Sequence, residues 1–158
     1  MIELDKIINA FAWRKMPNPP AMDFNAITSE QKDASWFEWR NWREISRKDW
    51  EEHRDAIFAF TPEQFAYYLP SILKINLEDP EEWFWQASHV LEVLDRSPVV
   101  DYWDDFFKSR FLGLKKEEYV ALKEWLLCLR DGQGVAADNS IDRAFDTISL
   151  LEQKIELA

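Results

Sequence analysis

A helix start in the middle of the chain constrains the fold more than any other feature of the sequence. In residues 60–73, Thr61 and Gln64 have the spacing of a capping box, in which the hydroxyl accepts from the backbone three residues on and the amide reaches back. Pro62 takes the first helical position, where its missing N–H costs nothing. The same segment carries an apolar face at i, i+3 and i+4, made of Phe65, Tyr68 and Leu69. We therefore expect a helix that begins at residue 62 and packs into a core.

Pro70, within the same segment, predicts an interruption of that helix. Proline has no N–H to donate, and it disfavours helical dihedrals at the residue before it. We expect one short helix over 61–67 and a second over 70–77, set at an angle to the first. The hydroxyl of Tyr67 or Tyr68 would then donate to a carbonyl that the proline leaves free.

Apolar stripes with a helical period recur along the rest of the chain. We expect a helix over 1–15, a proline-rich connector over 16–27 and a helical core over 28–158. Further helix starts are expected at Thr28, Ser46, Asp79, Ser97, Lys115 and Ser140. Inward-facing residues are expected to include Phe58 and Phe106. The three glycines are too few for the many turns of a sandwich or barrel, so the sequence predicts one compact all-α domain over 1–158 with six to eight helices.

A segment that combines tryptophan and arginine, residues 35–45, is predicted to be helical or irregular. Its members are the residue types richest in interface hot spots, and the candidate interface consists of Trp36, Trp39, Arg40, Trp42 and Arg43. The same pattern also fits a core edge with arginine packed over tryptophan. Aromatic and basic residues can stack nucleic-acid bases as well, but the acidity of the chain argues against that partner.

The charge of the chain is −11, and residues 62–98 hold seven acids against two bases. A negative surface repels nucleic-acid phosphates and anionic lipid, so we expect no nucleic-acid or membrane partner. It favours a basic protein partner, although such a surface can also serve solubility alone. No apolar run is long enough to span a bilayer, and Cys128 is the single cysteine, so we expect a cytoplasmic protein without an internal disulfide.

No set of residues has the spacing of a catalytic or metal centre. His53 and His89 both lack a carboxylate three residues before them, which a helical metal site would supply. Cys128 lies in an apolar stretch and is expected to fill the core. Three further acids have the spacing of a solvated helix face rather than of a metal site: Asp101, Asp104 and Asp105. We expect no cofactor, no metal and no enzymatic activity.

Residues 60–70 read Phe-Thr-Pro-Glu-Gln-Phe-Ala-Tyr-Tyr-Leu-Pro. This motif resembles one in an uncharacterised family of small helical bacterial proteins, whose version reads Leu-Thr-Pro-Glu-x-Phe-x-Tyr-Tyr-Leu-Pro. The resemblance covers residues 42–75 and implies a bacterial, cytoplasmic, helical protein. It brings no catalytic or binding residue with it.

The small size, the negative charge and the nine tryptophans favour a non-enzymatic protein-binding domain. Within that class, an immunity-type or antitoxin-like inhibitor that covers a basic partner fits the charge best. The alternative is a regulatory domain that binds a small molecule in an aromatic pocket between helices. Its candidate wall consists of Tyr67, Tyr68, Trp83 and Trp85.

Overall fold

The computed structural model describes residues 2–23, 25–131 and 138–157, and every regular element in these ranges is helical. The elements are α1 (Ile2–Phe11), α2 (Ser29–Trp36), η1 (Trp42–Glu44), α3 (Arg47–Glu52), α4 (Ala56–Ala59), α5 (Pro62–Glu78), α6 (Trp85–Leu94), η2 (Val100–Tyr102), α7 (Asp105–Phe111), α8 (Lys116–Asp131) and α9 (Asp138–Leu157). The all-α prediction is confirmed.

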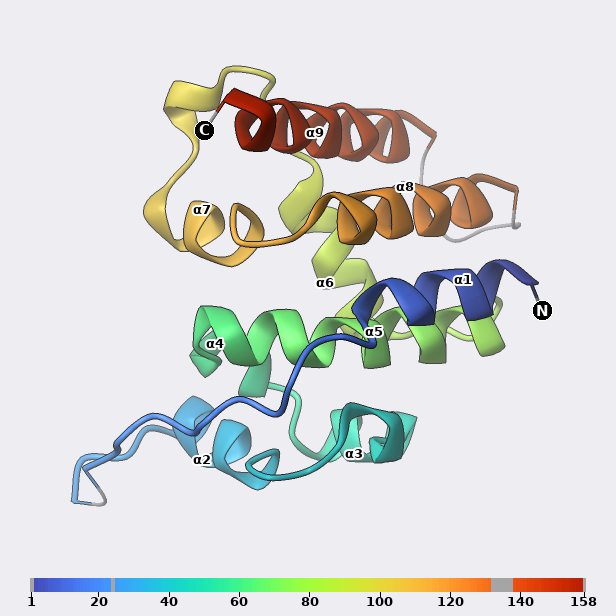
Figure 1. Cartoon of the computed structure of the whole chain (residues 1–158). Helices are drawn as coiled ribbons and strands as arrows, with labels where there is room; N and C mark the ends of the chain where they lie inside the picture. The colour runs from blue at the N-terminus through green and yellow to red at the C-terminus, as the bar shows by residue number, and fades with distance from the viewer. Residues whose placement is uncertain (1, 24, 132–137, 158) are drawn as a thin grey trace.

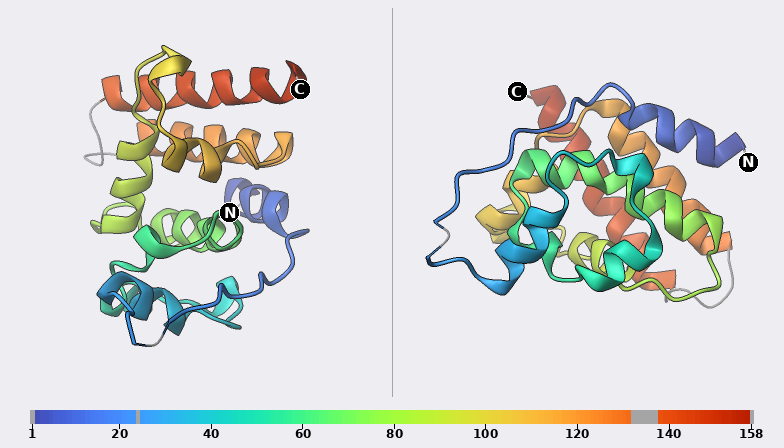
Figure 2. Two further views of the ribbon diagram at one scale, coloured as in Figure 1. Left: turned by 90° about the vertical axis from the view of Figure 1, so that its left-hand side faces the viewer. Right: turned by 90° about the horizontal axis from the view of Figure 1, so that it is seen from below.

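The helices form layers around α5 (Figure 1). On one side of α5 lie α1 and α8, and α9 packs on the far side of α8. On the opposite side lie α2, η1 and α3, as the turned view also shows (Figure 2). Helix α6 runs from α5 to α9, on the same side of α5 as α8. The centre of the molecule is therefore α5, and the candidate surfaces lie on the shorter elements around it.

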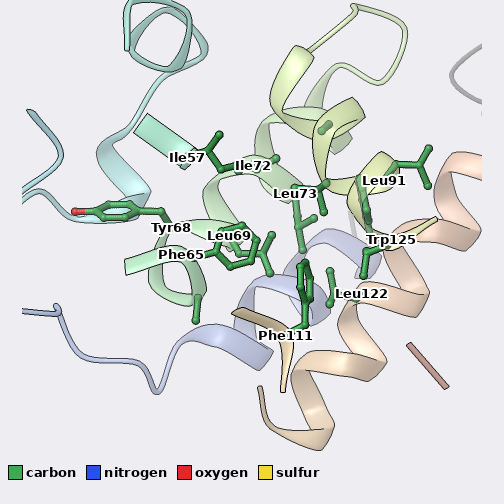
Figure 3. Packing of buried hydrophobic residues seen from close by; sticks show 14 of the residues in the cluster. Ile57, Phe65, Tyr68, Leu69, Ile72, Leu73, Leu91, Phe111, Leu122 and Trp125 are labelled. Carbon is green, nitrogen blue, oxygen red and sulfur yellow. The ribbon is translucent and has the colours of Figure 1, made fainter. Parts of the chain in front are cut away.

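Helix α5 is buried along almost its whole length: thirteen of its 17 residues are buried. Leu69 and Leu73 lie beside Phe111, Leu122 and Trp125, whereas Tyr68 points in the opposite direction (Figure 3). Burial on all sides explains why this helix has no polar face.

The predicted break at Pro70 is wrong, because α5 continues from Pro62 to Glu78 as one helix. An internal proline costs about 3 kcal/mol of helix stability. Here the proline and its neighbours are fully enclosed, and burial of a single leucine-sized side chain contributes about 1.5–3 kcal/mol. Packing on both faces of α5 therefore outweighs the missing hydrogen bond.

The helix starts at Thr28, Ser46 and Thr61 are confirmed, since each forms both hydrogen bonds of a capping box. The start at Asp79 is wrong: Asp79 ends α5, and α6 begins only at Trp85. Ser97 likewise begins no helix.

The helix expected to begin at Ser97 is replaced by the short η2 and by α7, which Asp104 caps with a 2.7 Å bond from the Phe107 amide. Helix α1 ends at Phe11 rather than at residue 15, and Ser140 lies inside α9. The expected starts at Asp79 and Ser97 were wrong because a proline after a small polar residue also suits a turn.

The sequence predicts that the helix beginning at Ser46 continues to about residue 59, but the structure divides this segment into α3 and α4. Phe58 and Phe106, expected inside, are 42% and 46% exposed. The sequence also predicts a loop over 131–134. Asp131 instead ends α8, and residues 132–134 lie outside the described residues.

Candidate functional site

The five residues of the predicted interface are divided between core and surface. Trp42 is buried against α5 and Trp36 is half-buried. Trp39, Arg40 and Arg43 are exposed, and Trp39 keeps 63% of its surface in solvent. Trp39, Arg40 and Arg43 are exposed enough to contact a partner directly. Trp42 is buried and is therefore excluded from the candidate interface.

The loop that carries Trp39 is held by a buried tyrosine. The Tyr68 hydroxyl lies 2.5 Å from the carbonyl oxygen of Phe37 and 2.8 Å from that of Arg40, so one proton serves both acceptors. Burial raises the pKa of this hydroxyl, which therefore stays a donor at neutral pH. These carbonyls belong to the loop and not to α5, contrary to the predicted partner of this tyrosine.

Trp39 itself has a φ of 63°, the one positive φ among the described non-glycine residues. This left-handed conformation costs an L-residue roughly 1–2 kcal/mol. Beside it, the Arg40 guanidinium stacks over Trp36 at 4.1 Å and its Nε donates to the Trp36 carbonyl. The loop thus presents an exposed indole in a fixed and strained conformation, which is typical of functional positions.

Trp36 also stacks on His53, with ring centroids 4.4 Å apart. The His53 Nδ1 lies 3.7 Å from an Asp33 carboxylate oxygen. The i, i+4 spacing of Asp49 and His53 predicts a pair on the surface of one helix. In the structure, the histidine at the end of α3 pairs instead with an acid of α2.

The four residues of the predicted pocket do not line one cavity. Tyr67 and Tyr68 are buried in α5, and their rings pack edge to face at 4.9 Å. Trp83 is 69% exposed, and Trp85 is half-buried and stacks on His89 at 5.1 Å. Tyr67 and Trp83 each border a different hollow.

The hollow beside Tyr67 has a volume of about 510 Å³ and lies between the proline-rich connector and the start of α5. The other aromatic residue of its wall is Trp13. The Lys115 ammonium lies 3.6 Å from the centre of the Trp13 ring, in a cation–π contact. Arg14, also at this hollow, is fixed by two hydrogen bonds to the fully buried Glu118, at 2.5 and 2.8 Å. This volume falls within the range of small-molecule sites.

A second candidate surface is the acidic turn, residues 78–83, which joins α5 to α6. Four exposed carboxylates precede the exposed Trp83: Glu78, Asp79, Glu81 and Glu82. Trp83 borders a hollow of about 60 Å³ whose floor includes Phe84 and Leu91.

Arg47 of α3 fixes the backbone of this turn. Its guanidinium donates to the carbonyls of Ile75 at 3.3 Å and Trp83 at 3.5 Å, and it lies over the Phe84 ring at 4.9 Å. Two of the carboxylates are partly neutralised, since Lys74 lies 3.2 Å from Glu78 and Arg47 lies 4.0 Å from Glu82. The acidic turn therefore has a net negative charge, and its backbone is fixed by Arg47.

A third surface was not anticipated from the sequence. It is an aromatic face formed by α4, α6 and α7, with Phe58 5.1 Å from His89 and Arg54 4.4 Å over Trp85. Arg110 of α7 lies over Phe106 at 3.7 Å. Its position carried a signal: Arg110 stands three residues after Phe107, on the face of the helix that the apolar pattern assigns to the core.

The described residues hold no group of three or more histidine, cysteine, aspartate or glutamate side chains that could bind a metal ion. Asp104 is a helix cap, and Cys128 is half-buried on α8. No helix within the described ranges is long and apolar enough to cross a membrane.

No protein-family model, no curated protein and no solved structure matches the chain.

Proposed function

We propose that this protein is a non-enzymatic protein-binding domain that docks a basic partner on its acidic turn. The observation that carries the proposal is Trp83, which is 69% exposed beside four exposed carboxylates. Tryptophan is the residue most enriched in binding hot spots, and a ring of this size is costly to leave in water.

The charges of the acidic turn support a basic partner. Asp79 and Glu81 form no ion pair with another described residue, so both can meet a lysine or arginine of a partner. The net charge of −11 adds a long-range attraction that speeds encounter with a basic protein and weakens with salt. An immunity-type or antitoxin-like inhibitor is the class of protein that this combination suits.

The exposed loop of Trp39 supplies a second anchor for the same class of function. Its fixed backbone lowers the entropy lost on binding, because the loop is already held in one conformation. Beside the acidic turn, a hollow of about 360 Å³ lies between residues 43–47 and the end of α5, and its walls include Arg43 and Glu78.

The test is binding to the product of the neighbouring gene, with titration calorimetry at two salt concentrations. We expect the partner to be basic, and its affinity to fall by about tenfold or more in Trp83→Ala and in the double variant Asp79→Asn and Glu81→Gln. Trp13→Ala is the matched control, because Trp13 is a half-exposed tryptophan far from any acidic cluster in sequence. Unchanged affinity in Trp83→Ala, or an acidic partner, would remove the proposal.

The inhibitor class is tested in the cell. If the partner is a toxin, co-expression of the wild-type chain relieves its toxicity, and co-expression of Trp83→Ala does not. Binding without any relief of toxicity would support the docking surface but contradict the proposal that the protein is an inhibitor.

A second candidate function, binding of a small molecule, is favoured by the hollow of about 510 Å³ beside Tyr67 and Trp13. A thermal-shift screen of metabolites tests it, since a ligand that binds only the folded state raises the melting temperature. A hit that Trp13→Ala abolishes supports this function. No stabilising compound in the screen would argue against it.

A further inference from the structure

Arg110 is a buried cation whose hydrogen bonding is incomplete. The residue is 7% exposed, and its Nη2 donates to the Phe60 carbonyl at 2.5 Å. Its Nε is buried and has no hydrogen-bond partner among the described residues. A buried donor without a partner is costly, and more so on a charged group.

No described carboxylate neutralises Arg110. It forms no ion pair with a described residue, and its nearest companions are aromatic rings, Phe106 at 3.7 Å and Phe65 at 5.7 Å. Burial lowers the pKa of its guanidinium to about 10, so the group is still charged at neutral pH. A buried charge without a counter-ion is rare, and this one occurs in a protein whose net charge is −11.

Arg110 borders a small hollow on the aromatic face. The volume of the hollow is about 10 Å³, close to what one water-sized group occupies. Its other walls are apolar or aromatic, among them Val93, Phe106 and His89. Phe106 is 46% exposed and His89 is half-buried, so the hollow lies near the surface.

We propose that Arg110 is the anchor of a carboxylate-binding site, which takes one carboxylate group between Phe106 and His89. Size and charge select this chemistry: a single oxygen fits the hollow, whereas a phosphate brings three oxygens and a second charge against apolar walls. The carboxylate comes either from a free small acid or from an aspartate or glutamate side chain of a partner. This site is separate from the acidic turn, so its existence does not depend on the proposed function.

His89 supplies an internal reporter of the bound charge. Burial lowers the pKa of His89, Glu92 raises it and Arg110 lowers it further. A carboxylate bound at Arg110 would place a negative charge nearby and raise this pKa.

The experiment is an NMR titration of the full chain with sodium acetate, against sodium chloride at equal ionic strength. We expect acetate to shift the Arg110 Nε–H resonance to saturation and to raise the pKa of His89, and chloride to do neither. In Arg110→Met, acetate affinity should fall at least about tenfold, as expected for loss of a charge-assisted hydrogen bond. The control is Arg54→Met, since Arg54 is also stacked on an aromatic ring of this face but is exposed.

A second probe distinguishes the two sources of the carboxylate. The blocked peptide acetyl-Ala-Glu-Ala-amide should bind more tightly than acetate if the site takes a partner's side chain, and more weakly if it takes a free acid. No saturable shift with either probe, an equal response to chloride, or full binding by Arg110→Met would overturn the site. The wild-type titration stands by itself if Arg110→Met fails to fold.

Discussion

Two regions on opposite sides of α5 are held together by different means. The aromatic layer, residues 28–60, consists of short elements whose rings meet at Phe37: Trp50 at 4.6 Å, and Phe60 and Tyr68 both at 5.2 Å. The long-helix layer, α8 and α9, is joined by a stripe of aliphatic residues that includes Leu126 and Ile148. Directional contacts hold the first layer, and periodic burial holds the second. We therefore expect the aromatic layer to tolerate changes of shape and polarity less well.

The largest effect is expected at Phe37, the centre of the aromatic layer. Phe37→Ala should lower the free energy of unfolding by about 3–5 kcal/mol, because it removes a fully buried ring and leaves a cavity. Urea denaturation measures this loss. Leu127→Ala, at a position 40% exposed in the other layer, is the control and should change stability by less than about 0.5 kcal/mol. A loss below about 2 kcal/mol at Phe37 would contradict its central place.

Tyr68→Phe isolates the polar contribution to the aromatic layer, since it keeps the ring and removes the hydroxyl. Two carbonyls of residues 37 and 40 then lose their donor, and we expect a loss of about 1–3 kcal/mol. Denaturant unfolding checks the value against Tyr102→Phe, where the tyrosine is 77% exposed and the change should be nearly neutral. Equal effects of the two substitutions would contradict the conclusion that directional contacts hold the aromatic layer.

Leu126→Met tests the tolerance of the long-helix layer. The two side chains have similar volumes, and the site offers a leucine stripe without directional contacts, so the loss should stay below about 1.5 kcal/mol. The same change at a ring position, Phe37→Met, should cost more. If Leu126→Met proves the more damaging in thermal unfolding, periodic burial is not what holds this layer.

Trp39→Gly should stabilise the protein slightly, by about 0.5 kcal/mol, because glycine adopts the positive φ without strain but gains freedom in the unfolded chain. The same variant should lose affinity for the partner. Trp83→Gly is the matched comparison: its φ is not positive, so glycine there brings no relief and should destabilise. A destabilised Trp39→Gly would show that the loop is not strained.

The smallest effect concerns the ion pair of Asp95 with Arg143, which links the end of α6 to α9. Hydrogen bonding to Arg143 holds the pKa of Asp95 below its ordinary value of 3.8, although burial opposes it. A lowered folded-state pKa contributes stability above pH 3.8 that is lost as the pH falls through the folded-state value. Asp95→Asn should thus be less stable than wild type at neutral pH and equal to it at low pH, as thermal unfolding from pH 7 to pH 2 would show. Asp101→Asn, at an exposed position, should show no such convergence.

Local signals along the chain predicted much of this fold. Capping boxes depend on residues three apart, so Thr28, Ser46 and Thr61 could be identified without any tertiary information. The stripe of α8 was equally local. Pro70 was misjudged because its environment depends on helices from both ends of the chain, and packing there overrides propensity.

The candidate sites were less accessible to sequence reasoning. Trp39 and Trp42 are three residues apart in one segment, yet Trp42 is buried and Trp39 is exposed. Trp39 lies in the turn of residues 37–40 with a positive φ, whereas Trp42 begins η1, which packs on α5. Arg110 lay on a predicted apolar face, but only the fold shows that no carboxylate reaches it. Spacing alone could not bring His89 and Arg110 to the same hollow.

The contact of α1 with α8 has a consequence for how the chain acquires its structure. The Arg14–Glu118 bond joins residues 104 positions apart. At a synthesis rate of about 5–20 residues per second, α1 waits roughly 5–20 s on the ribosome before its partner exists. During that time Ile7 and Phe11, both fully enclosed in the finished protein, lack α8, one of the two long helices that pack on α1. The first helix is therefore the segment on which chaperone capture during synthesis should concentrate.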